Sequence, residues 1–113
     1  GTGKPLREFI YVDDITLACI HILKKNNAEE LSLPINIGSG HEISIFDLAK
    51  MISKIIGFSG DIKVNKNRPD GAFRKLLDST KIKNLGWKPK TSLETGIKNT
   101  YKWYLNHYDN NLY

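Results

Sequence analysis

The chain has 113 residues, of which 40% are hydrophobic and 26% charged, and its formal net charge is +5. This length and balance fit one globular domain or a part of one, and they exclude a second independent core and wholesale disorder. No run approaches the roughly 18 consecutive apolar residues of a membrane span, and "GTGKPLREF" lacks the apolar centre of a secretory signal. We therefore expect a soluble, cytoplasmic protein.

Positive charge is spread along the chain rather than gathered in one place. No run of five or more basic residues occurs. The aromatic residues fall mostly where helices would bury them, so nucleic-acid bases would find few exposed rings on which to stack. We therefore expect no nucleic-acid or membrane partner, and we favour a small anion as the ligand.

The first part of the chain predicts a strand, a helix and a second strand. "EFIYV" (8–12) is rich in aromatic and β-branched residues, which predicts a short strand. The acidic pair that follows stops this strand and starts a helix over 14–25, with lysines at its end to complement the helix dipole. A surface loop then leads through Pro34 into "INIGSG" (35–40), a brief buried strand that ends in glycines.

The second part predicts three helices and one further strand. Ser44 and Asp47 form a capping box ahead of apolar residues at helical spacing, and Gly57 supplies a stop, so we expect a helix over 44–56. "DIKVNK" alternates as a strand should. The remaining helices are expected over 79–85 and, behind a second capping box, over 92–107. These elements together predict mixed α/β (α+β) structure.

The three expected strands are short and widely separated in the sequence. Such strands hardly form a sheet that closes its own edges. The opening "GTGKP" also resembles the middle of a loop more than a natural start. We therefore expect residues 1–113 to be the C-terminal portion of a longer protein.

A basic pair in "RPDGAFRKLLD" (68–78) is the strongest candidate for a binding site. Gly71 allows a sharp turn, so Arg74 and Lys75 are presented at a fixed place. Neighbouring side chains of an extended segment point to opposite sides, so one is expected to reach an anion and the other to pair with a carboxylate or face solvent. The pattern leaves open which takes which role. It also leaves open whether Arg7, in "REFIYVDD", meets a phosphate or one of the aspartates that follow.

Other motifs predict structure rather than chemistry. Gly38-x-Gly40 lacks the third glycine of a dinucleotide fingerprint and the lysine of a P-loop. The three histidines have no metal-ligand spacing. Cys19 lies in the apolar run "ITLACIHIL", where a small buried thiol is expected, and Trp87 is expected to anchor an indole against neighbouring helices. We therefore expect no catalytic, cofactor-binding or metal-binding residue in this chain.

Five stretches, taken in order, resemble the C-terminal part of the GDP-L-fucose synthase family, which belongs to the extended short-chain dehydrogenases/reductases. They are "GTGKPLREFIYVDD", "INIGSGHEISIFDLAKMI", "GFSGDI", "RPDGAFRKLLD" and "LGWKPKTSLETGIKNTYKWY". "REFIYVDD" and "INIGSG" alone would fit many nucleotide-sugar epimerases and dehydratases. "RPDGAFRKLLD" followed by "LGWKP" and "TYKWY" is much more particular to this family.

The resemblance implies a fold and a binding role. It implies that residues 1–113 are a substrate-binding portion whose N-terminal NADP(H)-binding Rossmann half is missing. It further implies that Lys75 and Arg7 contact the diphosphate or nucleotide part of a GDP-sugar, with Arg74 and Asp70 close to the same cleft. In the whole enzyme the implied reaction is 3,5-epimerisation and NADPH-dependent 4-reduction of GDP-4-keto-6-deoxymannose to GDP-L-fucose.

The family's catalytic motifs do not occur in this chain. Its Ser/Tyr-x-x-x-Lys set and its epimerisation Cys and His have no match here, so the chain alone is expected to be inactive. The resemblance implies a homodimer for the full-length enzyme. Two alternatives stay open: part of another nucleotide-sugar epimerase or dehydratase, and a free-standing nucleotide-sugar-binding or interaction module.

Overall fold

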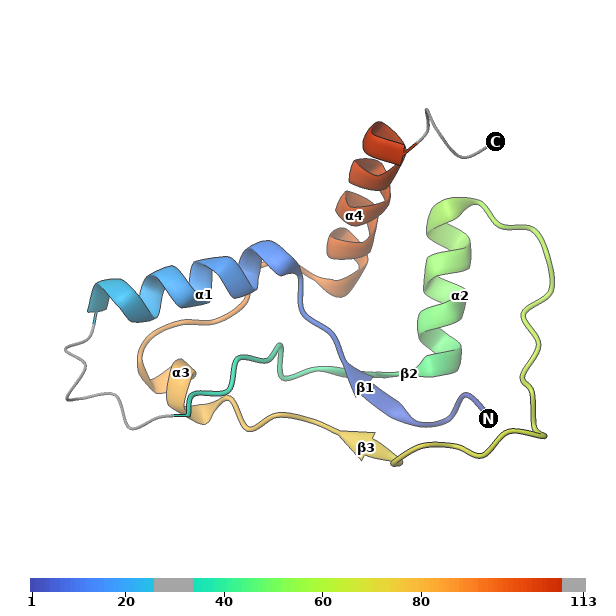
Figure 1. Cartoon of the computed structure of the whole chain (residues 1–113), viewed down its shortest axis with the longest axis horizontal. Coiled ribbons are helices and arrows are strands. Elements are labelled where there is room, and N and C mark those ends of the chain that lie inside the picture. The colour runs from blue at the N-terminus through green and yellow to red at the C-terminus, as the bar shows by residue number, and fades with distance from the viewer. Residues whose placement is uncertain (26–33, 109–113) are drawn as a thin grey trace.

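The structure is a computed structural model that describes residues 1–25 and 34–108. The described elements combine four helices with a three-stranded sheet, which confirms the mixed α/β class (Figure 1). In chain order they are β1 (Leu6–Glu8), α1 (Val12–Lys25), β2 (Glu42–Ser44), α2 (Ile45–Ile56), β3 (Arg74–Lys75), α3 (Thr80–Asn84) and α4 (Leu93–Tyr108).

The sheet has β1 at its centre, in the order β2-β1-β3. β1 pairs with β2 in the antiparallel and with β3 in the parallel sense. Arg7 lies opposite Lys75 on one side and opposite Ile43 on the other, whereas Leu6 lies opposite Arg74. Because side chains alternate along a strand, Arg7 and Lys75 leave the sheet on one face and Arg74 leaves it on the other.

All four predicted helices are present, and the capping residues explain where α2 begins and ends. The Ser44 hydroxyl accepts a hydrogen bond from the backbone N–H of Asp47 at 3.0 Å. At the other end Gly57 adopts a left-handed backbone with φ of 72°, which a glycine enters without the steric cost of a Cβ atom. The sequence pattern was sufficient here because a cap and its helix are local features.

The predicted strands are wrong in position. The first strand ends at Glu8, and α1 already begins at Val12; residues 35–40 and 61–66 form no strand. β2 and β3 were not predicted. A strand needs a hydrogen-bonded neighbour. The segment 35–40 has no such partner strand among the described residues. Two of its apolar residues, Ile35 and Ile37, nevertheless pack against the core. The predicted surface loop before Pro34 lies mostly outside the described residues.

The core within the described residues is small and lies between α1, α3 and the segment that follows α3. Ala18 and Ile82 are fully buried and Trp87 is 8% exposed, which confirms the predicted anchoring role of the indole. The prediction for Cys19 is wrong, since its side chain is exposed. α1 turns Ala18 rather than Cys19 toward the core.

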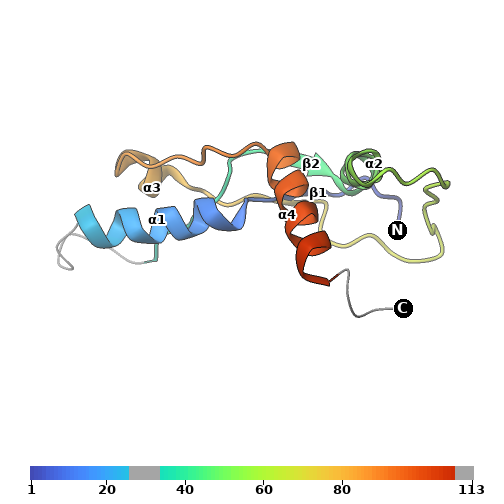
Figure 2. The same ribbon diagram turned by 90° about the horizontal axis from the view of Figure 1, so that it is seen from above.

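The molecule is thin, and α4 projects from one side of it (Figure 2). Its principal extents are 52 × 37 × 21 Å and its radius of gyration is 17.4 Å, compared with about 13 Å for a compact domain of this length. Large apolar side chains therefore stay exposed along α1 and α4, including Val12, Leu17, Leu23 and Tyr104. None of the helices in the part of the chain that the structure describes has the length and apolar content of a membrane span.

Candidate functional site

Arg7 and Lys75 form a pair of cations at the centre of the sheet. They are register partners in β1 and β3, so both side chains leave the same face. Arg7 is half-buried and Lys75 is exposed. Neither makes an ion pair with a carboxylate in residues 1–25 or 34–108, and the Arg7 guanidinium donates a hydrogen bond to the carbonyl oxygen of Leu6 at 2.6 Å. No carboxylate of the described residues therefore forms an ion pair with either cation.

Arg74 is engaged on the opposite face of the sheet. Its Nε donates to the Glu42 carboxylate at 2.7 Å, and its terminal nitrogen lies 2.5 Å from the same oxygen. The hydrogen bond to Glu42 raises the pKa of Arg74 above its usual value. The Glu42 side chain is only 10% exposed, compared with 60% for Arg74. Of the basic pair, Arg74 is therefore the residue that pairs with a carboxylate.

Asp70 faces a cleft that also contains Arg7. Its carboxylate accepts two hydrogen bonds from Thr2, at 2.7 Å from the backbone N–H and at 2.5 Å from the hydroxyl. These bonds hold the pKa of Asp70 below its usual value, so the group is a charged acceptor at neutral pH. The cleft has a volume of about 350 Å³, and its wall includes Gly71, Lys63 and Asn65.

Gly71 lets the turn in the segment 68–78 lie against Arg7. A Cβ atom added at this glycine would lie 3.4 Å from a terminal guanidinium nitrogen of Arg7, which is ordinary contact distance. Two of the four predicted site residues, Arg7 and Asp70, thus line one cleft, and Lys75 stands next to Arg7 on its face of the sheet. Arg74 alone leaves the sheet on the other side.

Three polar residues that support this arrangement were missed by sequence reasoning. Thr2 fixes Asp70 and Glu42 fixes Arg74, although each pair is far apart in the sequence. Glu8 accepts hydrogen bonds from two separate segments. No local pattern marks such long-range partners, so only the fold reveals them.

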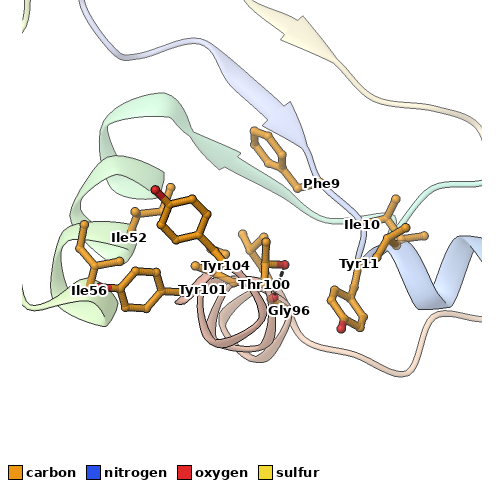
Figure 3. Close-up of a pocket in the computed structure, with 12 residues that line it drawn as sticks. Phe9, Ile10, Tyr11, Ile52, Ile56, Gly96, Thr100, Tyr101 and Tyr104 are labelled. Carbon is orange, nitrogen blue, oxygen red and sulfur yellow. Dashed lines mark hydrogen bonds between the residues drawn. The ribbon is translucent and has the colours of Figure 1, made fainter. Parts of the chain in front are cut away.

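A larger, apolar groove lies between α2, α4 and the segment that follows β1 (Figure 3). Phe9 and Tyr11 line it from that segment, and Ile52 and Tyr101 from the two helices. Its volume is about 650 Å³, and no charged side chain lines it. Gly96 allows close packing here, because a Cβ atom added to it would lie 3.2 Å from the Tyr11 side chain. The groove suits apolar side chains and offers nothing to a phosphate.

The other candidate sites are a metal centre and the loop that contains Gly38 and Gly40. No group of three histidine, cysteine or carboxylate side chains is placed to hold a metal ion in the described part of the chain. The Gly38–Gly40 loop does not fit a dinucleotide phosphate, because the Gly40 N–H already donates to the Glu8 carboxylate at 2.6 Å. A second anion at this N–H would meet that negative charge.

Comparison with known proteins identifies the relatives of this chain. No protein-family model matches it. GDP-L-fucose synthase 1 of Arabidopsis thaliana is 47% identical over 105 residues, which are 93% of this chain and 32% of that protein. The chain is homologous to the GDP-L-fucose synthases. This finding confirms the resemblance on which the sequence interpretation was based.

Solved structures agree with this relationship. A GDP-6-OMe-4-keto-L-xylo-heptose reductase from C. jejuni matches with a TM-score of 0.83 and 41% identity, over 94% of this chain and 32% of the other. A GDP-L-fucose synthetase from Naegleria fowleri, bound to NADP, matches with a TM-score of 0.84 and 28% identity, over 97% of this chain and 34% of the other. The chain thus has the fold of one portion of the extended short-chain dehydrogenases/reductases, and it spans about a third of the length of these relatives.

Proposed function

We propose that this chain binds the GDP-sugar substrate of an NADP-dependent epimerase/reductase of the GDP-L-fucose synthase type. The observation that carries the proposal is the pair of cations on one face of the sheet, Arg7 and Lys75, which have no carboxylate partner among the described residues and stand beside the cleft of Asp70. The homology supplies the class of enzyme.

The role that we propose for each residue follows from the chemistry of its side chain. The planar guanidinium of Arg7 can donate two parallel hydrogen bonds to phosphate oxygens, whereas Lys75 contributes a flexible point charge to the same diphosphate. The charged carboxylate of Asp70 would repel phosphate but accepts hydrogen bonds from a ribose diol. Arg74 then supports the cleft from the other face through Glu42. Binding of the nucleotide, which is remote from the reacting carbons, orients the sugar for the reaction in the remainder of the enzyme.

In this proposal the chemistry belongs to the remainder of the enzyme. NADP(H) carries the hydride, and the Gly38–Gly40 loop of this chain does not fit it. The remaining two thirds of the relatives' length would supply the Rossmann half, and we propose that it covers the exposed apolar side chains of α1 and α4. In full, we propose that the whole enzyme is a cytoplasmic, homodimeric GDP-L-fucose synthase. It would produce GDP-L-fucose from GDP-4-keto-6-deoxymannose.

The 113-residue chain by itself is expected to be inactive. It should neither bind NADPH with useful affinity nor reduce GDP-4-keto-6-deoxymannose, because it contains no dinucleotide-binding turn and none of the family's proton-transfer motifs. NADPH fluorescence, followed during titration and during turnover, measures both properties. Reduction of the ketone by the pure chain would contradict this assignment of the chemistry.

The decisive test of the proposal is nucleotide preference. It uses the whole polypeptide that contains this chain, titrated with GDP, UDP and dTDP in a calorimeter. We expect GDP to bind at least about ten-fold more tightly than the pyrimidine nucleotides, a difference of about 1.4 kcal/mol. A preference for UDP or dTDP would instead indicate another nucleotide-sugar epimerase or dehydratase, and no binding of any nucleotide would refute the proposed function.

A further inference from the structure

Glu8 connects three segments that are far apart in the sequence. One oxygen of its carboxylate accepts a hydrogen bond from the Gly40 N–H at 2.6 Å and a longer one from the Ser39 hydroxyl at 3.4 Å. The other oxygen accepts from the Leu77 N–H at 3.1 Å. Bonds from backbone N–H groups to a carboxylate are stronger than those between neutral groups. One side chain of β1 therefore forms hydrogen bonds with both the 38–40 loop and the segment that follows β3.

The bond to Leu77 extends the short pairing between β1 and β3. β3 has only two residues, Arg74 and Lys75. On one side of them Leu6 donates its N–H to the carbonyl oxygen of Phe73 at 2.8 Å. On the other side no backbone carbonyl of β1 receives the Leu77 N–H, and the Glu8 carboxylate takes its place. These two bonds flank Lys75 and add to the β1–β3 ladder, which places it opposite Arg7.

Gly38 leaves the space that this carboxylate occupies. A Cβ atom added at Gly38 would lie 2.5 and 2.8 Å from the two Glu8 carboxylate oxygens and 2.8 Å from the hydroxyl oxygen of the buried Ser79, closer than real contacts allow. Its φ is not positive, so the backbone itself would accept alanine. The absence of a side chain at Gly38 therefore makes room for the Glu8 carboxylate and the Ser79 hydroxyl, and the local turn does not require it.

We propose that Glu8 is a positioning residue for GDP-sugar binding, which acts through the bond to Leu77 to hold Lys75 in register with Arg7. The inference rests on the proposed function. Glu8 itself does not touch the ligand in this account: its carboxylate leaves the sheet on the face opposite to Arg7 and Lys75, as its place in β1 requires. Its contribution to affinity is therefore indirect and depends on Lys75.

A double-mutant cycle on GDP affinity tests this dependence. In the whole polypeptide, Glu8→Ala should weaken GDP binding by up to about ten-fold, and by no more than Lys75→Ala does, because Glu8 acts only through Lys75. In a Lys75→Ala background the same change should have almost no further effect, because the group that it positions is already gone. Hydrogen exchange should show faster exchange at the Leu77 N–H in Glu8→Ala.

Two further variants separate positioning from general loss of structure. Gly38→Ala, which displaces the carboxylate without removing it but also presses on the buried Ser79 hydroxyl, should retain the dependence on Lys75. Glu94→Ala is the matched control, because Glu94 is an exposed carboxylate that pairs with Lys98 on α4, and it should leave GDP affinity unchanged.

Three results would overturn the inference. Additive losses in the double mutant would show that Glu8 affects GDP binding independently of Lys75, and unchanged GDP affinity in Glu8→Ala would show that it has no role in binding. Failure of the wild-type protein to bind GDP would refute the proposed function, and the inference that rests on it would fall as well.

Discussion

Lys75→Ala should weaken GDP-sugar binding by about 1.5 to 3 kcal/mol, roughly ten- to a hundred-fold. The reason is that Lys75 is a cation on the same face as Arg7 and makes no ion pair with another residue of the described chain. Its interaction with a diphosphate would therefore not compete with an internal carboxylate. Titration of GDP into the whole polypeptide by calorimetry measures the loss. NADPH affinity should change little, because the proposal assigns that cofactor to the remainder of the enzyme.

Comparison with other basic residues shows whether the effect is specific. Arg7→Ala should cause a loss of similar size. Lys54→Ala, in the last turn of α2, removes an equally exposed charge away from the cleft and should be nearly silent. In steady-state kinetics the loss should appear mainly in KM, because the contact to a remote phosphate is made in ground and transition states alike. Equal GDP affinities of the wild type and Lys75→Ala would show that Lys75 is only a surface charge.

Local features of the sequence predicted the helices well and the strands poorly. The start of α2 follows from Ser44 and Asp47, which are three residues apart, and its end from Gly57. β2 and β3 depend instead on their distance from β1 in space. β2 contains a single apolar residue, Ile43, and β3 consists of two charged residues, so both patterns are too short to predict a strand. A strand of this kind exists only because a partner is present.

The candidate site likewise combines features that the sequence predicted with features that only the fold reveals. The sequence predicted that Arg74 and Lys75 point to opposite sides, because that follows from an extended backbone. It did not predict which residue pairs with a carboxylate, since Glu42 lies 32 residues before Arg74. The fold decides this by placing Leu6 opposite Arg74 and Arg7 opposite Lys75.

Trp87→Ala should reduce the free energy of unfolding by about 3 to 5 kcal/mol. Trp87 is 8% exposed and packs with Ala18 and Ile82 in the only cluster of buried hydrophobic residues within the described ranges. Removing the indole leaves a cavity that so few neighbours cannot fill. A loss of this size is a large part of the stability of a typical domain, so the variant should be largely unfolded without denaturant.

The second tryptophan provides a matched control for this expectation. Trp103 is 53% exposed on α4, where it stacks on His107, so Trp103→Ala should change the stability by no more than about 1 kcal/mol. Urea unfolding of the 113-residue chain, followed by far-ultraviolet circular dichroism, compares both variants with the wild type. If the two substitutions lowered the unfolding midpoint equally, the small cluster around Trp87 would not be the part of the molecule that holds α1 to α3.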